Sequence, residues 1–383
     1  MTDPRGPGQV RVGTRPQVAV VLGTRPGIVK FAPVLRRLNE ANVPHFAVHS
    51  GQHYSENMDK VFFEDLDIPL PNYRIGNLRP GVSQGEQTAE MLTGIERVLI
   101  RESPRIVLVG GDANTNLAGA LAARKLGMLV GHVEAGLRSR DWRMPEEHNR
   151  VMIDHISDVL FASSEHAKKT AEAEGVRGRI VVTGSTIGEA LRYSLERARG
   201  GASVVPPAAA DGYGLVTLHR QENVDDKVVL AGLCGAVREL PGKLGFPLLW
   251  PLHPRTRVRL DQFGLLGSLS DVAGLELLEP LGHVAFTRLL ADAGVVVTDS
   301  GGVQQEACIL HVPCVTARPT TEWVETVEAG ANMLAGAEAD SIVDACCAMV
   351  AKPRDWADPF RGNGASASHR VVDVAAGILG RAT

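Results

Sequence analysis

The sequence predicts an α/β protein built from two Rossmann-like, doubly wound domains. Short runs rich in β-branched residues alternate with amphipathic stretches along the chain. Strands that are apolar along their whole length, when they alternate with helices, indicate parallel sheets covered by helices on both faces. The length of 383 residues suits two domains of roughly 150–200 residues each rather than one.

The predicted strands fall into two groups separated by a segment without a periodic pattern. In the first half they are residues 18–22, 106–109, 129–133, 159–161 and 180–182. In the second half they are residues 214–218, 247–250, 275–278, 294–297 and 312–315. The amphipathic stretches between them predict helices and include residues 28–39, 85–101, 117–126, 146–156 and 284–291.

The segment 200–212 (GGASVVPPAAADG) divides the chain nearly in half. Its Gly, Pro and Ala residues predict a linker or a disordered loop. We therefore expect an N-terminal domain over residues 17–199 and a C-terminal domain over residues 213–365, with residues 1–16 as a disordered tail. Ligands of such domains bind at the carboxyl ends of the strands, and in two-domain proteins often in the cleft between the domains.

Composition excludes several classes of function. The net charge of −4 gives no global basic excess, so we expect no nucleic-acid partner. The five cysteines are odd in number and form no C-x-x-C pair, which suggests neither a disulfide framework nor a zinc site and fits reduced, mostly buried thiols. No apolar run approaches the roughly 18 residues of a membrane span, and residues 1–16 lack the apolar stretch of a secretory signal. We expect a cytoplasmic protein without a membrane partner.

Polar side chains follow the predicted strands of the first half. Segment 23–30 (GTRPGIVK) places Arg25 and Lys30 at a helix start, where they could bind pyrophosphate, although taken alone the segment slightly favours a tight turn with two solvated cations. Asp112 follows the next strand and could cap a helix or present a carboxylate to a cleft. His132 and Glu134 end another strand, where two titratable residues favour a functional role.

The helix start at 145–150 (PEEHNR) is ambiguous by itself. Pro145 suits the first helical position, and the helix dipole explains an acid such as Glu146 in the first turn without any function.

The second half repeats this arrangement with other residue types. Segment 298–306 (TDSGGVQQE) runs from a strand into a helix, so Ser300 and the amides of Gly301 and Gly302 can bind a phosphate, and Glu306 can accept hydrogen bonds from a ribose diol. An ordinary N-cap followed by a surface Glu is the alternative. His219 and Arg220 end the first strand after position 212 and could contact a phosphate, as could His253 after the next strand.

The placement of these motifs carries more weight than any one of them. Acids cluster after strands of the first half, and cations and small residues follow strands of both halves. This is the arrangement expected for a nucleotide diphosphate held across an interdomain cleft beside acid/base carboxylates.

Six motifs occur in one order: G-T-R-P-x-x-x-K, S-G-Q-H-Y, H-V-E-A-G-L-R, P-E-E-x-N-R, H-R-x-E-N and T-D-S-G-G-x-Q-x-E-A. Over residues 17–340 the chain resembles the non-hydrolysing UDP-N-acetylglucosamine 2-epimerases. The resemblance implies the GT-B-like architecture of two Rossmann domains with a cleft, and a C-terminal helix, over residues 366–379 of a segment 366–383, that returns to the first domain. It also implies a homodimer and an enzyme that needs neither a metal nor a nicotinamide cofactor.

The resemblance implies inversion at C2 of UDP-GlcNAc to give UDP-ManNAc, through elimination of UDP, a 2-acetamidoglucal and re-addition of UDP. It assigns the N-terminal domain to the sugar and the C-terminal domain to UDP. The implied catalytic residues are Asp112, Glu134, Glu146 and His219. The implied substrate- and UDP-binding residues are Arg25, Lys30, His219, Phe286, Ser300, Gly301, Gly302, Glu306 and Arg318. Gln52, Arg220 and His253 match an allosteric site for UDP-GlcNAc.

The chain departs from the family pattern at a few positions. Gly27 stands where the family usually has Glu, and Trp323 stands where it has a phosphate-side arginine, with Arg318 close by. These changes leave open a modified UDP-sugar as substrate. A hydrolysing 2-epimerase that releases ManNAc and UDP is a further alternative. The three acids argue against a non-enzymatic sensor, and the H-V-E-A-G and P-E-E motifs argue against a glycosyltransferase.

Overall fold

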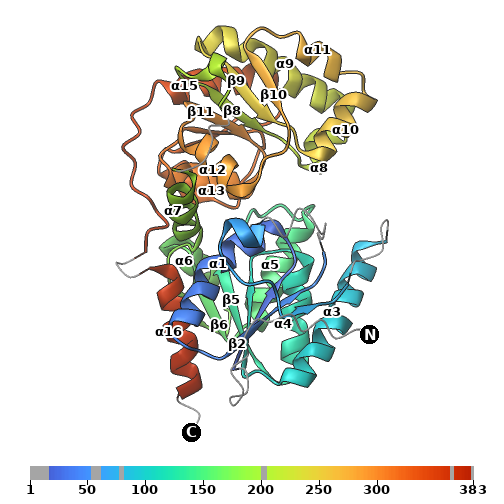
Figure 1. Ribbon diagram of the computed structural model, residues 1–383, viewed down its shortest axis with the longest axis vertical. Coiled ribbons are helices and arrows are strands. Elements are labelled where there is room, and N and C mark those ends of the chain that lie inside the picture. The colour runs from blue at the N-terminus through green and yellow to red at the C-terminus, as the bar shows by residue number, and fades with distance from the viewer. Residues whose placement is uncertain (1–16, 53–61, 77–81, 200–204, 363–365, 381–383) are drawn as a thin grey trace. The chain divides into compact units, whose positions relative to one another are not determined.

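The computed structural model describes residues 17–52, 62–76, 82–199, 205–362 and 366–380. The chain divides into two compact units (Figure 1). The first comprises Met1–Leu137, Asp141–Ala190 and Arg361–Thr383, and the second comprises Arg138–Arg140 and Leu191–Phe360. The predicted tail at residues 1–16 lies outside the described residues.

The first unit is built on a seven-stranded sheet in which every neighbouring pair is parallel. The strand order is β3-β2-β1-β4-β5-β6-β7. The bounds are β1 Val18–Leu22, β2 His45–His49, β3 Tyr73–Arg74, β4 Ile106–Gly110, β5 Leu129–Ala135, β6 Val159–Ala162 and β7 Arg179–Val182. Strand order reverses between β1 and β4, so the carboxyl ends of these strands flank a topological switch point, the usual place for a ligand.

Helices cover both faces of this sheet (Figure 1). They are α1 Arg25–Glu40, α3 Gln84–Glu102, α4 Asn114–Lys125, α5 Pro145–Ile156, α6 Glu165–Ala173 and α16 Ala367–Gly380, while α7 Ile187–Ala198 begins in the first unit and continues into the second. On one face α3 packs on α4 and α4 packs on α5, and their apolar side chains form a core with the strands. The C-terminal helix α16 packs against α1, where the Arg105 guanidinium also donates to the Leu379 carbonyl.

The second unit has a six-stranded, fully parallel sheet of order β10-β9-β8-β11-β12-β13. Its strands are β8 Gly214–Thr217, β9 Leu248–Pro251, β10 Leu275–Leu278, β11 Val295–Thr298, β12 Cys314–Thr316 and β13 Asn332–Leu334. Its helices are η1 Pro207–Ala209, α8 Gln221–Val224, α9 Lys227–Leu244, α10 Pro254–Gln262, α11 Leu266–Ser270, α12 His283–Ala291, α13 Gly301–Ile309, α14 Val324–Glu328 and α15 Ala339–Val350. Strand order reverses between β8 and β11, which gives this unit its own switch point.

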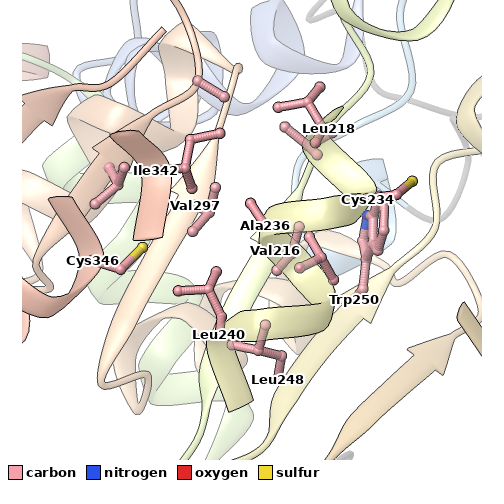
Figure 2. Close-up of a cluster of buried hydrophobic side chains, with 14 of the residues drawn as sticks. Val216, Leu218, Cys234, Ala236, Leu240, Leu248, Trp250, Val297, Ile342 and Cys346 are labelled. Carbon is pink, nitrogen blue, oxygen red and sulfur yellow. The ribbon is translucent and has the colours of Figure 1, made fainter. Parts of the chain in front are cut away.

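Alternate side chains of the strands bury on opposite faces of this sheet. Val216 and Val297 pack with residues of α9 and α15 such as Leu240 and Ile342 (Figure 2). Their neighbours in the strands, including Leu215, belong to a separate cluster with α12 and α13. The period of two and the burial of both faces explain why these strands read as continuous apolar runs.

The predicted fold class is confirmed, but three strands were not predicted. They are β2, β3 and β13: β2 begins and ends in histidine, and the other two are only two and three residues long. Among the described residues no helix is long and apolar enough to cross a membrane. All five cysteines are free thiols, and four are buried while Cys347 is exposed. Of the predicted linker, residues 200–204 lie outside the described residues, and the rest contains the short turn η1, in which Ala209 is buried.

Candidate active site

Glu134 lies in an irregular part of β5, at the carboxyl edge of the first sheet. The pairing of β5 with β6 shifts register between Val133 and Ala135, and Glu134 has a positive φ of 68°. A left-handed backbone at a non-glycine residue costs about 1 kcal/mol or more. Its carboxylate accepts a hydrogen bond from the Lys30 ammonium at 2.5 Å, and both side chains are nearly buried.

Lys30 reaches Glu134 from the first turns of α1. The helix begins as predicted, with Thr24 as N-cap and Pro26 in the first turn. Burial raises the pKa of Glu134 above its ordinary value, and the positive charge of Lys30 opposes that shift only in part. Gly111 has a φ of 84°, and a Cβ there would lie 2.4 Å from the Lys30 Nζ. The structure thus pairs the Lys30 ammonium with a candidate catalytic carboxylate, and its contact with pyrophosphate stays a prediction.

Asp112 follows β4, the strand beside β5 in the sheet. Its carboxylate pairs with the Arg150 guanidinium at 2.5 Å. The N-cap of α4 is Ala113, without a side-chain hydrogen bond, so of the two interpretations left open for Asp112 the N-cap is wrong. Charge-assisted hydrogen bonds to Arg are strong and directional. The Asn149 amide of α5 also donates to the Asp112 carbonyl at 2.8 Å, so α5 fixes the position of this loop.

The adjacent acids Glu146 and Glu147 of α5 have different environments. Glu147 is buried and pairs with Arg150 at 2.7 Å. Glu146 is half-buried, and it makes no hydrogen bond or ion pair within the part of the chain that the structure describes. Pro145 occupies the first helical position as predicted. Glu146 therefore keeps an open carboxylate one turn before the arginine that binds Asp112.

Two further predicted residues of the first unit contact their own chain. The Arg25 guanidinium lies 5.6 Å from the centre of the Phe62 ring. The Gln52 side-chain oxygen accepts from the backbone N–H of Thr115 at 2.9 Å and from its hydroxyl at 2.7 Å, and so fastens the start of α4. A role of Arg25 in binding UDP and of Gln52 in allostery stays a prediction.

Asp299 organises the corresponding edge of the second sheet. It is fully buried after β11 and accepts hydrogen bonds from the backbone N–H groups of His219 and Arg220 and from the Asn223 amide, at 3.0–3.1 Å. Its carboxylate also lies 3.2 Å from the Nδ1 of His219. Burial acts to raise the pKa of Asp299, but these donors outweigh it and hold the pKa below its ordinary value. Sequence reasoning missed this residue, although an acid directly after a buried strand was a signal.

The turn after Asp299 leaves polar groups without intramolecular partners in the part of the chain that the structure describes. Ser300 is the N-cap of α13, but its hydroxyl does not cap the helix. A Cβ on Gly301 would lie 2.0 Å from the Glu322 Oε1, so only glycine fits there. Glu306 is half-buried on the second turn of α13, and burial raises its pKa to about 8. The predicted helix start at Ser300 is present, and its binding of a phosphate stays a prediction.

A buried charge cluster lies beneath Gly301. The Arg318 guanidinium pairs with Glu322 at 3.1 Å, and the Arg220 guanidinium lies 3.8 Å from the other oxygen of Glu322. Trp323 is buried, packs edge-on against Phe360 at 5.2 Å, and has its indole nitrogen 3.4 Å from the position of a Cβ on Gly301. Because Arg318 is buried and ion-paired, its contact with UDP stays a prediction.

The remaining predicted residues lie elsewhere in the second unit. The rings of His219 and His253 are 5.3 Å apart, and His253 caps α10 by accepting from the Arg255 N–H. Phe286 of α12 is half-buried against the core cluster that includes Leu289 and Leu290. Within the described residues no group of three or more His, Cys, Asp or Glu side chains is arranged to hold a metal ion.

Comparisons with known proteins agree with this geometry. The family model described as UDP-N-acetylglucosamine 2-epimerase matches residues 36–376. The chain is 45% identical over 363 residues to the UDP-N-acetylglucosamine 2-epimerase of Methanocaldococcus jannaschii, and the match covers 94% of this chain and 98% of that protein. It is 39% identical over 364 residues to the UDP-2,3-diacetamido-2,3-dideoxy-D-glucuronate 2-epimerase of Pseudomonas aeruginosa, covering 94% and 99%.

Solved structures give the same result. The crystal structure of the Methanocaldococcus jannaschii UDP-GlcNAc 2-epimerase in complex with UDP-GlcNAc and UDP matches with a TM-score of 0.87 at 45% identity, and the match covers 94% of this chain and 99% of that one. The two parallel sheets with flanking helices are thus shared with that structure. The chain belongs to the UDP-N-acetylglucosamine 2-epimerase family.

Proposed function

We propose that this chain is an isomerase that inverts C2 of UDP-GlcNAc to give UDP-ManNAc. The observation that carries the proposal is the pair of carboxylates, Asp112 and Glu134, each held by a buried cation at the carboxyl edge of one sheet. Family membership supports the same reaction. An isolated buried carboxylate would be costly, whereas a paired one can take part in proton transfer without destabilising the unit.

The reaction begins with cleavage of the bond between C1 and the UDP oxygen. UDP leaves with the bonding electrons, positive charge develops on the ring, and a base removes the C2 proton to give a 2-acetamidoglucal. UDP then adds back to C1 while a proton is delivered to the opposite face of C2. Carboxylates stabilise such oxocarbenium-like charge, as they do in glycosidases.

We assign the acid/base work to Asp112, Glu134 and Glu146. Two of them handle the C2 proton on opposite faces, and the third stabilises charge on the ring. The raised pKa of Glu134 suits a group that both takes and gives a proton. The open carboxylate of Glu146 suits direct contact with the substrate.

We assign UDP to the second unit. The Ser300 hydroxyl and the amides of Gly301 and Gly302 bind phosphate oxygens, and Glu306 accepts hydrogen bonds from the ribose diol. His219, whose ring is oriented by Asp299, contacts the departing pyrophosphate. Arg25, Lys30, Phe286 and Arg318 complete the proposed set of substrate contacts.

Turnover in deuterium oxide tests the proposal. UDP-GlcNAc is incubated with the enzyme and the products are followed by NMR. We expect UDP-ManNAc with deuterium at C2. Epimerised product without deuterium at C2 excludes the proton-transfer route, and free ManNAc with UDP identifies a hydrolysing 2-epimerase instead.

A modified UDP-sugar is the second candidate substrate. The 39% identity to the Pseudomonas aeruginosa enzyme named for a diacetamido-glucuronate supports it, as does the buried Trp323 beside Gly301. A comparison of kcat/KM for UDP-GlcNAc and UDP-2,3-diacetamido-2,3-dideoxy-D-glucuronate distinguishes the two. If kcat/KM is higher for the diacetamido-glucuronate compound, that compound takes the place of UDP-GlcNAc as the assigned substrate.

We further propose a cytoplasmic homodimer. An open groove between α3, α4 and α5 supports the second copy as partner, because it carries apolar side chains including Leu92, Leu117 and Met152, the last 44% exposed. Light scattering on the purified chain tests it, and a Met152→Glu variant should shift the mass toward the monomer.

We also propose that Gln52, Arg220 and His253 bind a second UDP-GlcNAc molecule at an allosteric site. Sigmoidal kinetics with UDP-GlcNAc that are abolished by His253→Ala would support this proposal.

A further inference from the structure

A histidine and an aspartate form a fully buried pair beneath the two candidate catalytic carboxylates. His132 of β5 and Asp154 of α5 are 1% and 0% exposed. The His132 Nδ1 lies 2.6 Å from the Asp154 Oδ1, and the His132 Nε2 lies 3.1 Å from the Gly111 carbonyl oxygen. The other oxygen of Asp154 accepts from the Gly136 N–H at 3.1 Å. Nothing in the reaction proposed above uses either side chain.

The partners of the ring determine how many protons it carries. A backbone carbonyl can only accept, so the His132 Nε2 must be protonated. The short contact between Nδ1 and Asp154 also needs a proton. Because Asp154 accepts from Gly136 through its second oxygen, that oxygen has no need of a proton of its own. One proton therefore lies in the short bond between the His132 Nδ1 and the Asp154 Oδ1 and one on Nε2, so the pair carries no net charge.

The pair is attached to the backbone on both sides of the site. Gly111 directly precedes Asp112, and Gly136 follows Glu134 by two residues. The Gly111 N–H also donates to the Val133 carbonyl at 3.0 Å, next to the register shift of β5. One side-chain pair thus holds the loop that carries Asp112 and the left-handed segment that carries Glu134 in a fixed relation.

We propose that His132 and Asp154 are a positioning pair: a buried, hydrogen-bonded pair of side chains that fixes the backbone of Asp112 and Glu134 for the reaction. The proposal rests on the proposed function for the roles of Asp112 and Glu134. Neither His132 nor Asp154 contacts the substrate. Misplacement of reacting groups by about 1 Å can cost about 100-fold in rate, so a pair that acts only through the backbone can still control turnover.

The proton count is tested in the unmodified protein. Protein labelled with ¹⁵N-histidine is measured by NMR at about pH 7.5, and the His132 signals are assigned by their loss in His132→Gln. We expect a proton bound to Nε2 and a second, strongly downfield proton in the short bond between Nδ1 and Asp154. Absence of the downfield proton would overturn the proposed pair.

The positioning role is tested with a matched pair of variants. Asp154→Asn weakens the bonds to His132 and Gly136. Asp158→Asn is the control, because Asp158 also accepts from the backbone of β5, at Val130, but at the opposite end of the strand. We expect kcat to fall about 10- to 100-fold in Asp154→Asn, with KM and UDP affinity within about twofold of wild type, and kcat to stay within about twofold in Asp158→Asn.

The outcomes separate the two proposals. Equal losses of kcat in both variants, tracking their losses of thermal stability, would mean that Asp154 is merely structural. Full kcat in Asp154→Asn would refute positioning. If Asp154→Asn does not fold, His132→Gln takes its place with the same expected split between kcat and KM. A wild type that does not epimerise UDP-GlcNAc refutes the proposed function, while the NMR result still decides the proton count.

Discussion

The carboxyl edges of the two sheets use acidic residues in opposite ways. In the first unit, the carboxylates of Asp112 and Glu134 pair with the side chains of Arg150 and Lys30. In the second unit, the carboxylate of Asp299 is fully buried and binds backbone N–H groups, so it orders the loop of His219 and Arg220. The groups proposed to contact a ligand there are the His219 ring, the Ser300 hydroxyl, the amides at the start of α13 and the Glu306 carboxylate.

This difference separates chemistry from binding. Side-chain ion pairs keep carboxylates accessible and available for proton transfer, whereas a carboxylate bonded to backbone N–H groups is locked as an acceptor. Substitutions at the first edge should therefore change kcat, and substitutions at the second edge should change UDP affinity and stability. The four predictions that follow test this contrast, from the largest expected effect to the smallest.

Asp112→Asn should lower kcat by about 10²–10⁴-fold, because the amide keeps the size of the side chain but removes the base. UDP affinity, measured by calorimetry, should stay within about twofold of wild type because the proposed UDP contacts of Ser300, Gly301, Gly302 and Glu306 lie in the second unit. A parallel loss of UDP affinity and kcat in this variant would break the contrast between the two edges.

Asp299→Asn should destabilise the protein by about 2–3 kcal/mol, since it removes a charged acceptor of buried N–H groups. The lowered pKa of Asp299 gives the sign of the pH effect. Its contribution is present above its unfolded pKa of about 3.9 and is lost as pH falls through its folded pKa. The wild-type advantage in thermal unfolding should therefore shrink in acid.

Asp226→Asn is the matched control for this prediction. Asp226 also accepts backbone N–H groups, at the start of α9, but it is exposed to solvent and not buried. Asparagine caps helices about as well as aspartate, so the change in stability should stay within about 0.5 kcal/mol. A control as unstable as Asp299→Asn would show that burial is not the cause.

Glu306→Gln should remove a pH dependence of UDP binding. Burial raises the pKa of Glu306 to about 8, so the side chain is mostly neutral at neutral pH and ionises as pH rises through that value. If the carboxylate accepts from the ribose diol, wild-type affinity should increase about tenfold between about pH 7 and pH 9. Calorimetry should show a flat profile for the variant, and an equal rise in both proteins would remove Glu306 from the site.

Trp323→Phe should weaken UDP binding by about threefold, the smallest of these effects. Phenylalanine keeps the contact with Phe360 but lacks the indole N–H that lies near the start of α13. The control is Trp356→Phe, since the Trp356 indole donates to the Cys308 carbonyl, away from the proposed ligand. Equal UDP affinity in Trp323→Phe and wild type would leave Trp323 as a packing residue only.

The departure at Gly27 has a local explanation. In α3 the N-cap Ser83 and Glu86 three residues later form a reciprocal capping box. In α1 the N-cap Thr24 accepts from the Gly27 N–H at 3.3 Å, but Gly27 offers no carboxylate in return. A glutamate at this position would complete a second capping box. The first effect of its absence is therefore on the N-terminal cap of α1.

The sequence by itself determined the fold class and most of the strands and helix starts. Hydrophobic periodicity and turn residues act over a few neighbouring positions, and burial on both faces of a parallel sheet leaves an apolar run that is visible along the chain. Strand β2 was not predicted because its terminal histidines break that apolar run. Strand β13 was not predicted because three residues are too few to show a periodic pattern. The same local signals placed Ser300, Gly301 and Glu306 on a strand–turn–helix unit.

Only the tertiary structure decided which charged groups meet. Lys30 reaches Glu134 across 104 positions of sequence, and Asp299 holds the backbone of His219 across 80. It also decided that, of two adjacent glutamates, Glu147 is paired and Glu146 is open. The protonation and pairing of an ionisable side chain depend on the charges and solvent that the fold brings within a few ångströms of it. Those neighbours come from distant parts of the sequence and cannot be inferred from the adjacent residues.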